Sequence, residues 1–386
     1  MELAPFQVIL PPRIKFGWGT LGSIGSEAKK LGNKALVVTG RSFLARTGIL
    51  DRIKASLEEA GVEAVLFQEV EAEPSLETVE RGRKLLAQEA CDLVIGAGGG
   101  SSLDAAKAIA GLAREGGTVH DYFAGRAIEK PGLPWIAVPT TAGTGAEATK
   151  NSVLSDYKNK VKKSIRSDYW VSSLVIWDPE LTVHKSPSLT AATGMDALTQ
   201  AIESYTSRGA NPFTDSLARQ AVYLIGNSIL TAYREGDNRE ARENMALGCL
   251  LAGIALANAR LGVVHGMAHP VGIHYELAHG LVCGVLLPYA MEYNLEVVAD
   301  KYADVAALMG LDTSGLDTKA AAQLAIDRVR EINREMGIPA KLGEVGLREE
   351  DFAYIIEETM PSGSTKANPR EVTPEGVEDI LQRNLV

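Results

Sequence analysis

Hydrophobic and polar positions alternate in two different ways along this chain. In the first half, short runs rich in β-branched residues are separated by stretches whose apolar residues recur every three or four positions. The runs predict strands and the stretches predict helices. Because strands that alternate with helices form parallel sheets covered on both faces, we expect an α/β fold here. The predicted strands are 34–40, 63–70, 91–100 and 134–139, and the predicted helices include 41–61 and 75–90.

The pattern changes near residue 185, after which strand signals are few and long segments of helical spacing follow one another. We therefore predict two domains, an α/β domain over 1–185 and an all-helical domain over 186–386. A cleft between two domains is the usual place for a ligand. The predicted helices of the second domain are 186–205, 216–236, 241–259, 280–310 and 318–336.

Composition narrows the class of protein. The formal net charge of −10 argues against a surface that binds nucleic acid. No apolar run reaches the roughly 18 residues of a membrane span. The three cysteines, Cys91, Cys249 and Cys283, are odd in number and form no CxxC motif, which favours reduced, buried thiols in a cytoplasmic protein.

Two glycine-rich turns follow predicted strands, GAGGGSSLDAAK at 96–107 and PTTAGTGAEAT at 139–149. Glycines at a strand-to-helix turn let the backbone approach a diphosphate, and the helix N-terminus offers unpaired N–H groups. Neither turn is a regular GxGxxG fingerprint or a GxxxxGK phosphate loop, and glycine-rich turns also close α/β units that bind nothing. Two such turns at one edge of a parallel sheet nevertheless favour a bound dinucleotide.

Histidine is concentrated in the segment GVVHGMAHPVGIHYELAHG. Four of the six histidines lie there: His265, His269, His274 and His279. His265 and His269 have the i, i+4 spacing of a metal-binding pair on one helix face. Pro270 disfavours a helical conformation in the residue before it, so we expect His269 at a bend, aimed differently from His265. Spacing alone leaves open which of these histidines bind metal.

Several motifs occur together in this order: GGGSSLDAAK, PTTAGTGAEAT, GMDALTQAIESY and HGMAHP followed by HG, with IKFGWGTL near the start and NPREVTPEGVEDIL near the end. By these motifs the chain resembles the iron-containing alcohol dehydrogenase family over nearly its whole length. The resemblance implies a dehydroquinate synthase-like architecture, in which an α/β dinucleotide-binding domain precedes the helical domain. It also implies hydride transfer between NAD(P)H and a carbonyl group.

The resemblance assigns residues to the cofactor. The first turn would form the pyrophosphate loop, with Gly98, Gly99, Ser101 and Asp104. The second turn would face the phosphates and the nicotinamide, with Thr140, Thr141 and Thr144. Lys163 would reach the cofactor from below, although Lys160 and Lys162 are close enough in sequence to take its place.

The same resemblance separates the histidines. His265 and His279 match the metal-binding histidines of the family, and His269 matches a position beside the substrate. We expect His269 to deliver the proton that carbonyl reduction requires. His274 matches no ligand position and is expected at the surface or in contact with a ligand that it supports.

The other metal ligands are expected on GMDALTQAIESY. Asp196 and Gln200 lie one helical turn apart, so their side chains point the same way. Position 200 is a histidine in the commonest form of the family, and the neutral amide oxygen of Gln200 is a weaker donor to ferrous iron. Asp196, His265 and His279 would still hold a metal with one open position, similar to the Asp/His/His zinc site of glycerol dehydrogenases. We therefore expect Fe²⁺ or Zn²⁺.

Cofactor choice depends on Gly40, Arg41 and Ser42, at the end of the first predicted strand of the α/β domain. Relatives that prefer NAD resemble one another in placing an aspartate at the position of Gly40. A carboxylate there binds the ribose hydroxyls and repels a 2′-phosphate. Its absence, together with the charge of Arg41 and the hydroxyl of Ser42, predicts a preference for NADP(H), with NAD(H) as the alternative.

The predicted function is NAD(P)-dependent interconversion of a small to medium primary alcohol and its aldehyde by a homodimer or larger homo-oligomer. Alternatives are a glycerol dehydrogenase-like zinc polyol oxidoreductase and a relative that binds nucleotide or metal without turnover. A sugar-phosphate cyclase of the dehydroquinate synthase type would need basic residues for a substrate phosphate, and the segment around the histidines shows no such cluster.

Overall fold

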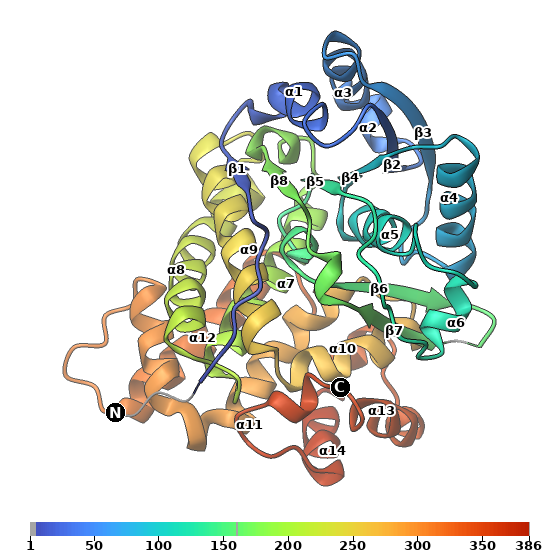
Figure 1. Ribbon diagram of the computed structural model, residues 1–386. Coiled ribbons are helices and arrows are strands. Elements are labelled where there is room, and N and C mark those ends of the chain that lie inside the picture. The colour runs from blue at the N-terminus through green and yellow to red at the C-terminus, as the bar shows by residue number, and fades with distance from the viewer. Residues whose placement is uncertain (1–4, 160, 386) are drawn as a thin grey trace. The chain divides into compact units, whose positions relative to one another are not determined.

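The structure is a computed structural model that describes residues 5–159 and 161–385. The chain forms two compact units, which Figure 1 shows. The α/β unit comprises residues 9–141 and 145–184, and the helical unit comprises the chain from residue 185 onward with two short segments, one of which is 142–144.

A six-stranded parallel sheet forms the centre of the α/β unit, in the order β1-β8-β5-β4-β2-β3. Its strands are β1 (Ile14–Phe16), β2 (Lys34–Gly40), β3 (Glu63–Val70), β4 (Leu93–Gly98), β5 (Trp135–Pro139) and β8 (Leu174–Trp177). Every residue of β4 and β5 is buried, as expected for central strands covered on both faces. The predicted parallel sheet is confirmed.

Helices cover the two faces of this sheet. Ile24 and Ile53 pack in one apolar core with Ile95 of β4. The opposite face receives α5, where a Cβ atom at Gly96 would lie 2.6 Å from the Cβ atom of Ala106. Gly96 therefore allows α5 to lie closer to β4 than any other residue type would. The helices of this unit are α1 (Ile24–Ala28), α2 (Phe43–Arg46), α3 (Ile49–Glu59), α4 (Leu76–Gln88), α5 (Gly100–Gly111) and α6 (Val119–Phe123).

The strand order creates a topological switch point between β2 and β4. From β2 the chain continues to β3 on one side, whereas β4 lies on the other side of β2 and is followed by β5. In open parallel sheets, ligands bind outside the carboxyl ends of the strands at such a point. Because β2 ends at Gly40 and β4 ends at Gly98, two of the segments expected to bind the cofactor begin there.

Several segments of the α/β unit differ from the expectation. Strands β1 and β8 of the sheet were not predicted from the pattern. The stretch 41–61, predicted as one helix, is divided into α2 and α3 at Gly48, whose φ of 71° is in the left-handed region. An antiparallel hairpin, β6 (Asn151–Asp156) with β7 (Val161–Arg166), follows the second glycine turn. Its strands are short, and β7 has mostly polar residues, so the sequence pattern did not reveal them.

The second unit is all-helical, as predicted, and four of its long helices begin at capping residues. Ser186, Asn211, Asn238 and Asp317 each accept a hydrogen bond from a backbone N–H of the first helical turn. The helices are α7 (Pro187–Thr206), α8 (Pro212–Arg234), α9 (Arg239–Ala259), α10 (Val263–His274), α11 (His279–Leu308), α12 (Thr318–Glu335), α13 (Phe352–Thr359) and α14 (Pro374–Arg383).

Helix α10 contains Pro270 in its interior. The prediction that Pro270 forces His269 out of the helix is wrong, because α10 continues through both residues. The bend lies earlier, at Arg260 with its φ of 67°, and α9 and α10 are bent by 104° relative to each other. Most of the apolar side chains of α10, such as Met267, are fully buried, and this burial outweighs the hydrogen bond lost at the proline. His269 therefore stays one helical turn from His265.

Some helices of the helical unit are as apolar as membrane-spanning helices. Among the described residues, α11 is long and apolar enough for a span, as is the bent pair of α9 and α10 taken together. The core helix of a folded unit has the same composition, and 67% of the most apolar window of α11 is buried inside the structure. These helices are therefore accounted for as core helices.

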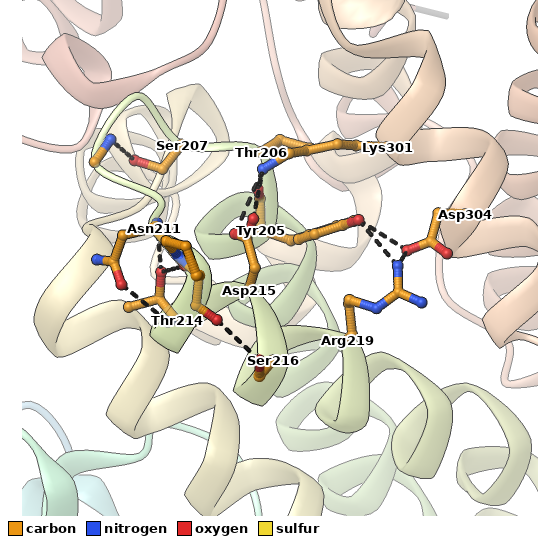
Figure 2. A network of polar contacts seen from close by, with 12 residues as sticks. Tyr205, Thr206, Ser207, Asn211, Thr214, Asp215, Ser216, Arg219, Lys301 and Asp304 are labelled. Atoms are coloured by element: carbon orange, nitrogen blue, oxygen red, sulfur yellow. Dashed lines mark hydrogen bonds and ion pairs between the residues drawn. The ribbon is translucent and has the colours of Figure 1, made fainter. Parts of the chain in front are cut away.

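A polar network joins the end of α7 to α8 and α11, as Figure 2 shows. The hydroxyl of Tyr205 donates to Asp304 Oδ2 at 2.8 Å, and Arg219 donates to the same hydroxyl at 3.2 Å and pairs with Asp304. Lys301 Nζ donates to the backbone oxygen of Tyr205. Helix α11 is kinked at Val298, so the network fixes the part beyond the kink against the helix that contains Asp196.

Candidate active site

Three helices of the second unit bring Asp196, His265 and His279 together. Asp196 is on α7, His265 is on α10, and His279 is the first residue of α11. Oδ1 of Asp196 lies 3.3 Å from Nε2 of His265 and 3.9 Å from Nε2 of His279. A tetrahedral ion with bonds of about 2.0 to 2.2 Å holds its nitrogen and oxygen donors roughly 3.3 to 3.6 Å apart. The three donors therefore fit a divalent metal ion after a small contraction.

Glu203 orients the imidazole of His265. Its Oε2 lies 2.7 Å from Nδ1 of His265, and its Oε1 accepts a hydrogen bond from the backbone N–H of Val264 at 2.7 Å. A carboxylate that hydrogen-bonds one ring nitrogen of a histidine fixes the ring so that the other nitrogen can bind metal. Sequence reasoning missed Glu203, although it lies two helical turns after Asp196 on the same face of α7.

The protonation of His265 reflects the two carboxylates. Burial lowers the pKa of His265, but hydrogen bonds and charge attraction from Asp196 and Glu203 outweigh this and raise it to about 9. A metal ion takes the lone pair that such a proton would occupy, so binding releases the proton. The two carboxylates balance the positive charge in either case.

Gln200 lies beside Asp196, as the spacing predicts. Its Nε2 donates to Oδ1 of Asp196 at 3.0 Å, so the amide nitrogen faces the carboxylate. Its Oε1 is buried and accepts no hydrogen bond from the described part of the chain. Gln200 in this orientation holds the carboxylate of Asp196 in place.

The remaining two histidines of the segment occupy different environments. The ring of His269 stacks on the ring of His279, with centroids 5.0 Å apart, so it lies beside the three metal donors. His274 lies at the end of α10, and its Nε2 is 3.0 Å from Oδ1 of Asp351. The structure therefore brings His269 to the cluster and gives His274 a partner on another segment.

The first glycine turn joins β4 to α5. Gly98 has a φ of 148°, and a Cβ atom there would lie 2.5 Å from Oγ of Ser102. Gly99 is the N-cap of α5 and provides no side-chain cap, so the N–H groups of the first turn are available to a ligand. Close backbone approach and an open helix N-terminus are the features that bind a diphosphate.

The side chains of two further residues of this turn accept hydrogen bonds from backbone N–H groups. Ser101 Oγ accepts from the backbone N–H of Glu73 at 3.2 Å, and Asp104 Oδ2 accepts from Val153 N at 3.1 Å. Burial raises the pKa of Asp104 to about 6, against the attraction of Lys107. The contacts of Asp104 are therefore with β6 and with α5 itself.

Lys107 is a buried residue that sequence reasoning missed. Its Nζ donates to the backbone oxygens of Ala146 and Asn151 at 2.8 and 2.6 Å and to Thr149 Oγ1 at 2.9 Å. Lys107 thereby fixes the chain that follows the second glycine turn against α5. A lysine within an alanine-rich helix gives no local signal that it is buried.

The other cofactor candidates lie as follows. Thr140 donates its backbone N–H to Gly98 O at 2.9 Å, so the two turns are directly connected, and the Cβ of a residue at Gly99 would contact Thr141. Thr144 lies in the segment that belongs to the helical unit. Lys163 is exposed on β7 with its Nζ 4.6 Å from the ring centre of Phe123; Lys162 pairs with Glu73, and Lys160 lies outside the described residues.

The residues expected to contact the cofactor ribose lie at the end of β2. Gly40 is the last residue of β2, and a Cβ atom there would meet only ordinary contacts, 3.6 Å from Val70 O and 3.8 Å from Ser102 Oγ. Arg41 and Ser42 are exposed, and Ser42 is the N-cap of α2. Position 40 therefore has room for a side chain, and the guanidinium group of Arg41 follows it in the chain.

A parallel α/β unit followed by a helical unit with an Asp/His/His cluster is the arrangement of a metal-dependent dehydrogenase. The family described as "Iron-containing alcohol dehydrogenase" matches residues 11–179, and "Fe-containing alcohol dehydrogenase family, C-terminal" matches residues 190–385. The chain belongs to the iron-containing alcohol dehydrogenase family.

Individual relatives agree with this assignment. The chain is 40% identical over 385 residues to a 1,3-propanediol dehydrogenase of Citrobacter freundii, covering 99% of this chain and 100% of the relative. It is 38% identical over 376 residues to an NAD-dependent methanol dehydrogenase of Bacillus methanolicus, covering 97% and 99%. A crystal structure of a 1,3-propanediol oxidoreductase superimposes with a TM-score of 0.96 at 40% identity, covering 99% and 100%. The predicted fold class, family and enzyme class, a metal-containing alcohol dehydrogenase, are confirmed.

Proposed function

We propose that this protein interconverts a small to medium primary alcohol and its aldehyde, with a nicotinamide cofactor and a divalent metal ion. The observation that supports this most directly is the convergence of Asp196, His265 and His279 from three helices in a fold of this family. The relatives named for methanol and 1,3-propanediol act, by their names, on small primary alcohols. They support the substrate class without selecting one alcohol.

Asp196, His265 and His279 would hold the metal ion. When bound, Fe²⁺ or Zn²⁺ supplies Lewis acidity that polarises a carbonyl oxygen or stabilises an alkoxide. The protein residues prepare the site for this role: Glu203 fixes the ring of His265, and Gln200 fixes the carboxylate of Asp196. Both contacts reduce the reorganisation that metal binding requires.

The two glycine turns would hold the dinucleotide. The backbone at Gly98 and Gly99 and the N-terminus of α5 would bind the diphosphate, with Ser101 nearby. We assign Asp104 a positioning role, because its carboxylate binds β6. The cofactor, when bound, supplies or accepts the hydride. Further cofactor contacts are proposed for Thr140, Thr141, Thr144 and Lys163.

His269 is the proposed proton donor and acceptor. It stacks on His279 and therefore lies next to the proposed metal ligands without being needed as one. A histidine in this place can transfer a proton to or from the substrate oxygen, directly or through water.

We further propose a preference for NADP(H) over NAD(H). Gly40 provides no carboxylate to repel a 2′-phosphate, and the exposed Arg41 and Ser42 offer a positive charge and a hydroxyl. We also propose a cytoplasmic homodimer or larger homo-oligomer, in which Cys91, Cys249 and Cys283 are thiols; all three are buried and none is in a disulfide.

The direct test is the oxidation of NADPH and NADH by a panel of aldehydes, followed by absorbance. We expect turnover by the native protein, strong loss after exhaustive chelation, and loss in His265→Ala. The control is His120→Ala, which removes an exposed histidine of α6. Full activity after chelation, with no metal detected, would contradict the Lewis-acid proposal. Bound metal without oxidation of either cofactor would favour the redox-silent alternative, and a strong preference for polyols would favour the glycerol dehydrogenase-like one.

A further inference from the structure

We propose that Cys283 is the fourth protein ligand of the metal ion, which completes the donor set Asp196, His265, His279 and Cys283. This inference rests on the proposed function, because it requires a metal ion at that cluster. It adds a sulfur donor to the three donors already described. The sequence reasoning had treated Cys283 as an ordinary core thiol.

The position of the sulfur atom is the first observation. Cys283 lies one helical turn after His279 on α11, and its Sγ is 3.6 Å from Nε2 of His279. That contact alone would follow from the i, i+4 spacing. However, ligand atoms of Cys283, His279, Asp196 and His265 all lie within 4.8 Å of one another, although Asp196 and His265 come from α7 and α10. Three-dimensional packing, and not helix spacing, therefore places the thiol at the cluster.

The distances agree with one coordination sphere. A tetrahedral ion with a metal–sulfur bond of about 2.3 Å and a metal–nitrogen bond of about 2.1 Å separates the sulfur and nitrogen by roughly 3.6 Å. The Sγ of Cys283 and Nε2 of His279 are 3.6 Å apart, and Nε2 of His265 and Oδ1 of Asp196 are 3.3 Å apart. Both separations are those of donors that share one ion, and the 3.9 Å between Oδ1 of Asp196 and Nε2 of His279 requires only a small contraction.

Gln200 is the second observation. Its amide turns Nε2, a donor group with no lone pair for a metal, toward Asp196. Its buried Oε1 accepts no hydrogen bond from the described residues. The side chain at position 200 thus orients Asp196 and leaves the fourth ligand position to another residue. Cys283 is the residue that reaches it.

A sulfur ligand has chemical consequences. Cysteine binds metals as the thiolate, so its proton leaves to solvent when the ion binds. Thiolate is softer than imidazole or carboxylate, and a mixed Cys/His/Asp set favours Zn²⁺ over Fe²⁺ more than an Asp/His/His/His set does. Catalytic zinc sites can expand to five donors, so four protein ligands still allow a substrate oxygen to enter.

Cobalt substitution tests the ligand directly. The protein, freed of metal by chelation, is titrated with Co²⁺ and its absorption spectrum is recorded. We expect a thiolate-to-cobalt charge-transfer band in the near ultraviolet together with the visible bands of a four- or five-coordinate ion. Cys283→Ala and Cys283→Ser should still bind Co²⁺ but lose this band. Loss of a residue that only supports a ligand typically lowers metal affinity by roughly 10- to 100-fold. The affinity of the two Cys283 variants for Co²⁺ should fall by at least that much.

The outcomes of the cobalt titration distinguish a failure of the Cys283 inference from a failure of the proposed metal site. Cys249→Ala removes a buried thiol that is outside the cluster, so the band should persist. If the native protein binds one Co²⁺ per chain without the band, or if Cys283→Ala keeps it, Cys283 is not a ligand and the three-donor site stands. If the native protein binds no Co²⁺, the proposed metal site itself is wrong. If neither Cys283 variant folds, the rate at which Cys283 of the native protein is alkylated is compared with and without bound Co²⁺. Slower alkylation with Co²⁺ supports Cys283 as a ligand, and an unchanged rate overturns it.

Discussion

Oε2 of Glu203 lies 2.7 Å from Nδ1 of His265, and the opposite nitrogen of the same ring lies 3.3 Å from Oδ1 of Asp196. The imidazole is therefore held between the carboxylate of Glu203 and that of Asp196, the proposed ligand. Glu203 also accepts the backbone N–H of Val264 in the first turn of α10, so it fixes the helix and the ring together. A substitution at Glu203 should therefore weaken metal binding without removing a proposed ligand.

We accordingly expect Glu203→Gln to weaken metal binding by about 10- to 100-fold, because the neutral amide orients the imidazole less firmly and removes a negative charge. Competition of the protein with a chelator of known affinity measures the change. The control is Glu296→Gln, at an exposed glutamate of α11 that pairs with Lys319. Equal affinities of Glu203→Gln and the native protein would show that Glu203 does not support the site.

A second prediction concerns the missing imidazole. Gln200→His should place a nitrogen donor next to Asp196, one helical turn away, and so increase the iron that the protein retains during purification without added metal. A gain of one to two orders of magnitude in affinity corresponds to about 1.4 to 3 kcal/mol. Mass spectrometry of the metal content measures it, with the exposed Gln382→His as the control. Iron content no higher than that of the control would contradict the prediction.

A third prediction concerns cofactor choice. Gly40→Asp should shift the ratio of kcat/KM for NADPH over NADH toward NADH, because the new carboxylate binds ribose hydroxyls and repels a 2′-phosphate. The contacts around Gly40 leave space for the first atom of the side chain. Arg41→Ala should shift the ratio in the same direction by removing the charge. A native protein that clearly prefers NADH would refute the proposed NADP(H) preference.

A fourth prediction concerns proton transfer. His269→Asn should lower kcat for aldehyde reduction by about 10²-fold or more and flatten its pH dependence, because asparagine cannot donate or accept a proton in this range. Metal content should stay close to native, since His269 is not a proposed ligand. The control is His274→Asn, which changes a histidine that lies against Asp351. If His269→Asn keeps the native pH–rate profile, His269 has no role in proton transfer.

A fifth prediction concerns stability in acid. Glu27 is buried in α1, and hydrogen bonds from Lys15, Lys30 and Arg13, together with the charge of Arg13, lower its pKa to about 2 despite its burial. Since the folded pKa is below the unfolded value, the ionised form stabilises the fold above pH 4.5, and this contribution is lost as the pH falls from about 4.5 to 2. Its three partners are about half exposed, so we expect only about 1 kcal/mol.

Glu27→Gln should therefore reduce the free energy of unfolding at pH 7 by about 1 kcal/mol and make it less dependent on pH between about 4.5 and 2. Urea unfolding of the native protein and the variant at several pH values measures both effects. Glu58→Gln, at an exposed glutamate of α3, is the control. An unfolding free energy that depends on pH equally in Glu27→Gln and the native protein would rule out this contribution.

Local pattern was sufficient for the fold class. Helical spacing predicted five helices of the second unit, over 186–205, 216–236, 241–259, 280–310 and 318–336. Runs rich in β-branched residues predicted β2, β3, β4 and β5 of the first unit. The pattern did not reveal the strand order, in which β8 returns between β1 and β5. Sheet order depends on contacts between segments far apart in the chain, and local periodicity contains no information about them.

The same division applies to the candidate site. Asp196, Gln200 and the histidines became candidates because they lie in short motifs that resemble those of the family. Glu203, Lys107 and Cys283 were not, since a glutamate, a lysine or a cysteine within an apolar helix has no local signal of its partner. Pro270 was misjudged for a related reason: its local preference against the helix is weaker than the burial of α10 in the core.

The sequence alone thus predicted the family and the succession of an α/β part and a helical part, and it indicated the proposed ligands and cofactor turns. Only the packing of α7, α10 and α11 determined that Cys283 Sγ shares a cluster with Asp196, His265 and His279, and that Glu203 supports His265. The physical reason is one of range. Backbone preferences act over a few residues, whereas a metal site depends on side chains that are as many as 87 positions apart, from Asp196 to Cys283, and that meet only when the helices bury their apolar faces together.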